Sequence, residues 1–129
     1  MKKIYIDVCC LNRPFDDQTQ DRIRLEAESI LLILQHLESK EWQWFSSVVV
    51  DYEIDQTPNL ERRSRVKQLA AGSHKIIRLN NSITERGKEI KSMGFKTYDA
   101  LHIACAEDGQ ADIFLSTDDK LLKLGARYA

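Results

Sequence analysis

The run Ile4-Tyr5-Ile6-Asp7 near the start of the chain contains three β-prone residues and ends on an acid. Asp is depleted within strands, so its place here marks the end of a strand. Working outward, three further β-like runs are Trp44-Phe45 (leading into Ser46-Ser47), residues 75–79 and residues 113–115. Helical patterns separate these runs, at roughly 21–39, 48–57, 60–71, 81–93, 98–107 and 118–124. The alternation predicts an α/β fold: a three-layer α/β/α sandwich around a parallel sheet of four or five strands.

Length and composition fit one ordinary globular domain. The chain has 129 residues, 43% hydrophobic and 30% charged, so we expect a single domain over residues 1–129. No apolar run approaches the ~20 residues of a membrane span, and Asp7 interrupts any leader-like stretch. Cys9, Cys10 and Cys105 show no metal-type spacing, and we interpret them as buried thiols in a reducing compartment. These features predict a cytoplasmic protein that does not contact membranes.

Several helices carry start signals and one-sided apolar patterns. Ser47, Thr97 and Thr117 each precede a helical segment and are candidates for its N-cap. The segment 98–107 is apolar nearly all round, which predicts a central, buried helix. The run 30–34 is wider than one buried stripe needs, so part of it is expected to face a partner.

Four acids are predicted to meet at one edge of the sheet. Asp7 closes the first strand and Asp118 follows the last, so both belong at the carboxyl edge, where sites in open parallel sheets form. Asp99 lies in the first turn of the buried helix, and Glu53 lies on the apolar face of the helix that leaves the second strand. Alternatives remain open: the helix dipole alone favours acids at positions 99 and 118, and Glu53 could belong to a buried salt bridge. Asp119 is an alternative or additional candidate to Asp118, with Thr117 beside it.

Converging carboxylates repel one another, and a divalent cation removes that conflict. All-oxygen ligands suit Mg²⁺ or Mn²⁺, as one or two ions, rather than zinc. The sequence contains no Walker loop, glycine-rich dinucleotide fingerprint or nucleophile elbow. Metal-assisted hydrolysis of a phosphodiester is therefore the chemistry that this set of acids favours.

Four segments resemble those of the PIN-domain family, in the family's order and spacing. They are the strand ending in Asp7, Ser46-Ser47 followed by Glu53, Tyr98-Asp99-Ala100-Leu101-His102-Ile103-Ala104, and residues 114–122 (Phe-Leu-Ser-Thr-Asp-Asp-Lys-Leu-Leu). The resemblance covers the whole chain. It implies a Mg²⁺- or Mn²⁺-dependent ribonuclease with Asp7, Glu53, Asp99 and Asp118 as catalytic and metal-holding residues. It further implies a toxin of the VapC type, which commonly forms homodimers and is neutralised by a small antitoxin protein.

The chain also departs from the family pattern. The family often has a hydroxyl or amide residue within two positions of its first Asp, whereas this chain has Val8 and Cys9. Residues 11–17 are less typical, and one more edge strand would be natural after residue 124.

Net charge is −1, so contact with RNA requires a local basic patch rather than an overall excess. His102 lies three residues after Asp99, on the same side of its helix, and a hydrogen-bonded packing role is the simpler interpretation. One rival is a metal-dependent phosphatase, in which Lys120 would assist a nucleophilic Asp; another is a non-catalytic PIN-like module that binds nucleic acid. The candidate RNA-binding residues are Arg78, Arg86, Lys88, Lys91 and Lys96.

Overall fold

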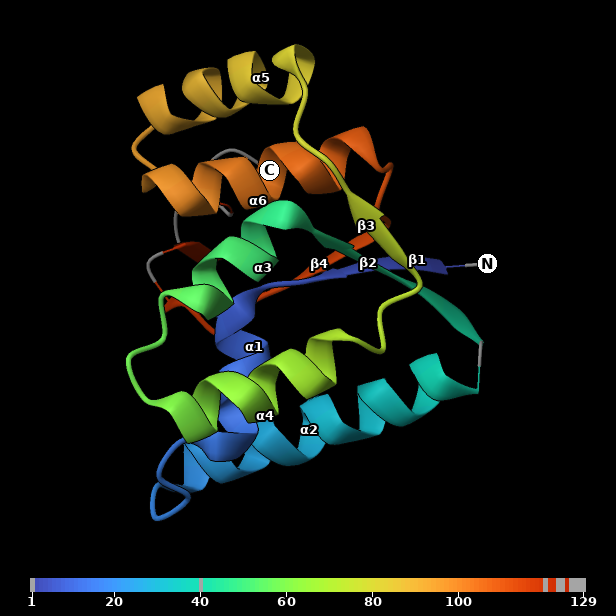
Figure 1. Cartoon of the computed structure of the whole chain (residues 1–129), viewed down its shortest axis with the longest axis vertical. Helices are drawn as coiled ribbons and strands as arrows, with labels where there is room; N and C mark the ends of the chain where they lie inside the picture. The colour runs from blue at the N-terminus through green and yellow to red at the C-terminus, as the bar shows by residue number, and fades with distance from the viewer. Residues whose placement is uncertain (1, 40, 120, 123–124, 126–129) are drawn as a thin grey trace.

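Four parallel strands form the centre of the computed structural model, which describes residues 2–39, 41–119, 121–122 and 125. In this part of the chain the strand order is β3-β2-β1-β4 (Figure 1). β1 (Lys2–Ile6) pairs with both β2 (Trp42–Ser47) and β4 (Ile113–Leu115), and β3 (Lys75–Ile77) pairs with β2. Because every pairing is parallel, all four strands end at one edge of the sheet. The predicted parallel sheet is thus confirmed with four strands; a fifth, after residue 124, would lie almost wholly outside the described residues.

The sheet is buried because helices cover both of its faces (Figure 1). On one side lie α2 (Asp21–Glu38) and α4 (Leu60–Ala70), and on the other α6 (Thr97–Asp108), against which α5 (Asn81–Ser92) packs. Ile4, Tyr5 and Ile6 are all buried, as expected for a central strand covered on both faces. This is the predicted three-layer α/β/α arrangement.

Two short elements at the carboxyl edge were not predicted. α1 (Val8–Asn12) follows β1 directly, and a 3₁₀ turn, η1 (Arg13–Phe15), continues it with Pro14 in its first turn. A five-residue helix is too short to show helical periodicity, so the pattern of apolar residues could not reveal it. α3 (Val48–Asp55) leaves β2 at the same edge, and Ser47 caps it as predicted by accepting a hydrogen bond from the Val50 N–H.

Two of the predicted caps are wrong. α6 begins at Thr97 itself, and Lys96 occupies the N-cap position without a side-chain hydrogen bond. In the helical turn that follows β4, the capping residue is Asp118 rather than Thr117. Its Oδ1 accepts a hydrogen bond from the Leu121 N–H at 3.1 Å. Thr117 and Asp118 are both favoured N-cap residues, so the sequence could not choose between them, whereas nothing in the sequence marks Lys96 as a cap. The predicted helix 118–124 falls partly on residues 120, 123 and 124, outside the described ones.

The core fills both sides of the sheet. All three cysteines are free thiols; Cys10 and Cys105 are buried as predicted, whereas the prediction is wrong for Cys9, which is half-buried beside Asp7 and the turn after β4. In the apolar run of α2, Ile30 is buried, whereas Leu31 and Leu32 are exposed. Among the described residues no helix is both long and apolar enough to cross a membrane.

Candidate functional site

Asp7 is held rigidly where β1 ends. Its backbone N–H donates to the Leu115 carbonyl oxygen at 3.0 Å, which continues the β1–β4 ladder by one residue. Its side chain caps α1: Oδ1 accepts from the Val8 N–H at 2.8 Å, and Oδ2 accepts from the Ser116 hydroxyl at 3.1 Å and the Cys9 thiol at 3.4 Å. The carboxylate is only 5% exposed. These three donors are uncharged, so they orient the carboxylate without offsetting its charge, which suits it to hold a cation.

Glu53 is oriented by a buried chain of polar groups. His102 Nε2 lies 2.7 Å from Glu53 Oε1, and His102 Nδ1 lies 2.6 Å from the Tyr5 hydroxyl, which itself lies 2.7 Å from Ser47 Oγ. An ionised carboxylate only accepts hydrogen bonds, so Nε2 carries the proton facing Glu53. Nδ1 then accepts from Tyr5, and the Tyr5 oxygen accepts from Ser47. Burial raises the pKa of Tyr5 well above its usual value, which keeps this hydroxyl protonated.

The structure therefore gives Glu53 a partner, but the partner is a histidine rather than an arginine. His102 is fully buried and is bonded at both ring nitrogens, which confirms its interpretation as a hydrogen-bonded packing residue. It also approaches Asp7, with Nε2 3.6 Å from Oδ1. One imidazole thus lies between two of the predicted site acids.

Asp99 is surrounded by the negative charge of the other acids. Partial burial, followed by the charges of Asp7 and Asp118, raises its pKa to about 6; His102 opposes this shift, and Glu53 adds to it. Asp7, Glu53 and Asp118 therefore all lie within electrostatic reach of Asp99, although the four acids come from separate segments of the chain. Excess negative charge at one place is the condition that a divalent cation relieves.

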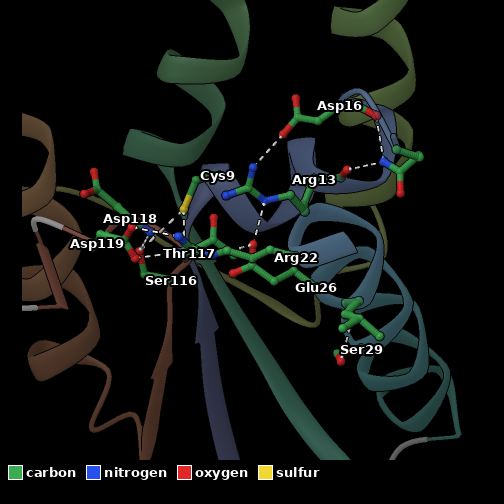
Figure 2. A network of polar contacts seen from close by, with 12 residues as sticks. Cys9, Arg13, Asp16, Arg22, Glu26, Ser29, Ser116, Thr117, Asp118 and Asp119 are labelled. Atoms are coloured by element: carbon green, nitrogen blue, oxygen red, sulfur yellow. Dashed lines mark hydrogen bonds and ion pairs between the residues drawn. The ribbon is translucent and has the colours of Figure 1, made fainter. Parts of the chain in front are cut away.

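Asp118 is positioned by a tight turn after β4 (Figure 2). Ser116 Oγ accepts a hydrogen bond from the Asp118 N–H at 3.1 Å while donating to Asp7, so one hydroxyl connects the two acids. Cys9 supports the same turn, because its sulfur accepts from the Thr117 N–H at 3.3 Å. Thr117 is 8% exposed, and its Oγ1 has no hydrogen-bond partner among the described residues. A buried hydroxyl without a partner beside these acids is a fitting contact for a water molecule or a hydrated ion.

The carboxylate of Asp119 bonds to Arg22 rather than to the residues that position Asp118. Its carboxylate receives two hydrogen bonds from the Arg22 guanidinium, at 2.5 and 2.8 Å. Figure 2 shows how Arg22 leads on to Glu26 (3.6 Å), then to Arg13 (3.4 Å) and Asp16 (3.2 Å). This ion-pair chain ties the turn after β4 to α2 and η1.

The remaining candidates fall into three groups. Arg86 pairs with Glu89 and Glu107, and Lys88 pairs with Glu85, so these two predicted RNA-binding residues are engaged on the surface of α5. Arg78, Lys91 and Lys96 form no ion pair with any described residue. Asp112 lies at the opposite, amino edge of the sheet, where it accepts from the Lys3 N–H, and Lys120 lies outside the described residues.

Sequence reasoning missed the residues that hold the acids in place. Tyr5, Ser116 and Cys9 each bond a site acid or its partner, yet in the sequence they appear as an ordinary strand residue, a loop residue and a small apolar residue. The only sequence feature that could have identified them is a side chain able to form hydrogen bonds within two residues of Asp7 or Asp118. Distance along the chain hid the rest, since Ser116 lies 109 residues from Asp7.

The donor set fits a hard divalent cation. Carboxylates and a threonine hydroxyl supply oxygen ligands, and Mg²⁺ and Mn²⁺ prefer oxygen. Within the described residues, no group of three or more His, Cys, Asp or Glu side chains already stands in metal-binding geometry.

Comparison with known proteins finds a matching family and solved structures with a similar fold. The family model described as "PIN domain" matches residues 4–126. Among solved structures, VapBC2 from Rickettsia felis bound to a DNA fragment from their promoter matches with a TM-score of 0.65 and 14% identity, covering 95% of this chain and 92% of that chain. FitAcB from Neisseria gonorrhoeae matches with a TM-score of 0.62 and 15% identity, covering 95% and 93%. No curated protein matches this sequence significantly.

Proposed function

Because this chain belongs to the PIN-domain family, whose members are generally nucleases, we propose that it is a Mg²⁺- or Mn²⁺-dependent endoribonuclease. The observation that supports this most is that Asp7, Asp118 and Glu53, from three other segments, all lie close enough to Asp99 for their charges to raise its pKa. A cation held there would supply Lewis-acid chemistry: it would lower the pKa of a water molecule and offset charge on the phosphoryl group. The residues of the chain then have separate tasks.

Asp7 is proposed as the most firmly placed ligand, because both of its oxygens are oriented by donors from α1 and from the turn after β4. Glu53 is oriented by its hydrogen bond with His102. Asp118 is oriented by the hydrogen bond of its N–H to Ser116 Oγ and by the one that its side chain accepts from the Leu121 N–H. Asp99 brings a carboxyl group whose proton is easily displaced near neutral pH. Asp119 is a less suitable ligand, since Arg22 already binds both of its oxygens.

RNA with an unpaired stretch is the proposed substrate. A small, open site at a sheet edge reaches the backbone of a single strand more easily than that of an A-form helix, whose major groove is deep and narrow. Arg78, Lys91 and Lys96 are proposed as phosphate contacts because no described acid neutralises them.

The proposed biological role is that of a toxin with an antitoxin partner, acting in the cytoplasm. Support comes from the likeness to VapBC2 and from an apolar surface on α2 that a partner could cover. Leu31 is exposed at a groove of about 380 Å³ between α2 and α4, lined also by Leu34, Trp44 and Leu69. A homodimer contact is proposed at Leu32, which is 59% exposed on the same helix.

The test is cleavage of labelled single-stranded RNA in Mn²⁺ by wild type, by wild type with EDTA and by Asp7→Asn. We expect EDTA and Asp7→Asn each to lower the rate at least ~100-fold, since each removes the cation or its best-placed ligand. Asp112→Asn is the matched control, because it removes an acid at the opposite edge of the sheet. Cleavage that survives in Asp7→Asn or in EDTA would contradict the proposal.

A further inference from the structure

Two exposed tyrosines flank the site acids. Tyr52 directly precedes Glu53 in α3, and Tyr98 directly precedes Asp99 in α6. Their ring centroids are 5.9 Å apart and their planes are tilted by 49°. Tyr52 is 54% exposed and Tyr98 40%, whereas Trp44, Phe45 and other aromatic residues of the core are almost fully buried. These rings therefore offer flat apolar faces to solvent beside the acids.

The pair lies within reach of the charge of the site. Desolvation, then Tyr52 and the charge of Glu53, raise the pKa of Tyr98. The contact between α3 and α6 that puts Glu53 within electrostatic reach of Asp99 also brings the Tyr52 and Tyr98 rings together. A ligand whose phosphate is held near Glu53 and Asp99 would bring its neighbouring group against these rings.

We propose that Tyr52 and Tyr98 form a platform on which an unpaired nucleobase next to the scissile phosphate stacks. This inference rests on the nuclease function proposed above. A nucleobase is the flat group that RNA carries within one nucleotide of every phosphate, and stacking on aromatic rings is the usual way in which proteins hold it. Rings tilted by 49° cannot both stack on the same base, so one ring stacks and the other contacts the edge of the base.

The platform makes the enzyme selective for strand state rather than for sequence. Every base has a π-face, so stacking tolerates any of the four, but in a duplex those faces are covered by neighbouring base pairs. The tyrosines would thus favour single-stranded RNA over the same sequence in a duplex.

The experiment compares Tyr52→Ala, Tyr98→Ala, Tyr52→Phe and Tyr98→Phe with wild type. The matched control is Leu25→Ala, which removes a comparably exposed apolar side chain (59%) from α2. Cleavage in Mn²⁺ is measured on one single-stranded oligoribonucleotide whose cut site has been mapped, and on versions that lack the base on either side of that cut. Binding is measured by fluorescence anisotropy of the same strand on the Asp7→Asn background, and thermal melting confirms folding.

We expect the alanine variant of the stacking ring to lose about 5- to 150-fold in kcat/KM and in affinity, which is the range of one stacked base, and the alanine variant of the other ring to lose less. The phenylalanine variants should stay within about threefold of wild type, because they keep the ring. On one of the abasic strands, the kcat/KM and affinity of wild type should fall to those of the variant without the stacking ring. Removing the base should not lower the kcat/KM or affinity of that variant any further.

Three results would overturn the platform. The alanine variants could cleave and bind RNA as wild type does, or the phenylalanine variants could lose as much kcat/KM and affinity as the alanine variants. The third is that the alanine variants lose the same kcat/KM and affinity on abasic strands as on the intact strand. Unchanged RNA binding together with loss of self-association would assign the pair to a protein contact instead. Wild type that cleaves no RNA would contradict the nuclease proposal, and the binding measurement would still decide the platform.

Discussion

His102 Nε2 donates to Glu53 Oε1 across 2.7 Å, so a fully buried imidazole fixes the direction of a half-buried carboxylate. On its far side the imidazole depends on Tyr5, whose hydroxyl lies 2.6 Å from Nδ1. Orientation of Glu53 is therefore set inside the core rather than at the surface.

Tyr5→Phe tests this chain with the smallest change. It leaves Nδ1 of a fully buried histidine without its donor, so we expect the free energy of unfolding to fall by about 1–3 kcal/mol, measured by urea denaturation. Phe114 stacks on the ring of Tyr5 with centroids 5.5 Å apart, and phenylalanine keeps that contact. A Tyr5→Phe variant as stable as wild type would show that the hydrogen bond contributes nothing net.

Asp99→Asn probes the repulsion among the acids. In the metal-free protein the pKa of Asp99 is raised from 3.8 to about 6, so its ionisation opposes folding. This penalty is absent below pH 3.8, grows as pH rises and is complete above about pH 6. Because the side chain is partly exposed, we expect Asp99→Asn to be more stable than wild type by only about 1 kcal/mol at pH 8.

The measurement is urea denaturation in EDTA at pH 5 and pH 8, where the advantage of Asp99→Asn should be larger at pH 8. Adding Mn²⁺ at pH 8 should reverse the order, since wild type alone keeps the full set of acids for the cation. An advantage for the variant that is the same at both pH values would contradict the raised pKa.

Asp118 and Asp119 can be separated by paired variants. Asp118→Asn should weaken Mn²⁺ binding at least ~10-fold, because it removes one negative charge from the site. Mn²⁺ affinity is measured by titration calorimetry. Asp119→Asn breaks an ion pair between two largely exposed side chains, so we expect a loss in stability of under ~1 kcal/mol and nearly unchanged Mn²⁺ affinity. Equal losses of Mn²⁺ affinity in both variants would make Asp119 a ligand as well.

Gly109→Ala tests how closely α6 ends against the sheet. A Cβ at this position would lie 2.7 Å from Ile77 Cδ1 and 2.8 Å from Phe45 Cδ2, closer than carbon atoms pack. The Phe45 ring is 3% exposed and has little room to move, so we expect destabilisation of about 1–3 kcal/mol. The control is Gly125→Ala, where a Cβ meets no atom within 4 Å.

Much of the fold was predictable because its signals are local. The acid after Ile4-Tyr5-Ile6 and the alternation of apolar runs gave the parallel sheet, and both depend only on residues close in sequence. α1 was not predictable, because five residues show no period and its cap, Asp7, had already been interpreted as a site acid.

The acids of the candidate site were predictable for the same reason, since their place after strands or in first helical turns is a local property. Their supports were not. Tyr5 and His102 are 97 residues apart, and nothing in the sequence indicates that a strand tyrosine faces a helix histidine. Three-dimensional packing alone creates that contact.

The pairing of β1 with β4 has a consequence for synthesis. β1 is made first, but its carboxyl edge lacks the Leu115 carbonyl and the Ser116 hydroxyl that fix Asp7 until residues 113–118 have been translated. A contact this distant in sequence also forms slowly, because a long loop must close first. A nascent chain still held by the ribosome, with β4 inside the exit tunnel, therefore carries three of the acids without the geometry that uses them. The candidate site is therefore assembled only after the last described strand has been made and has paired with the first.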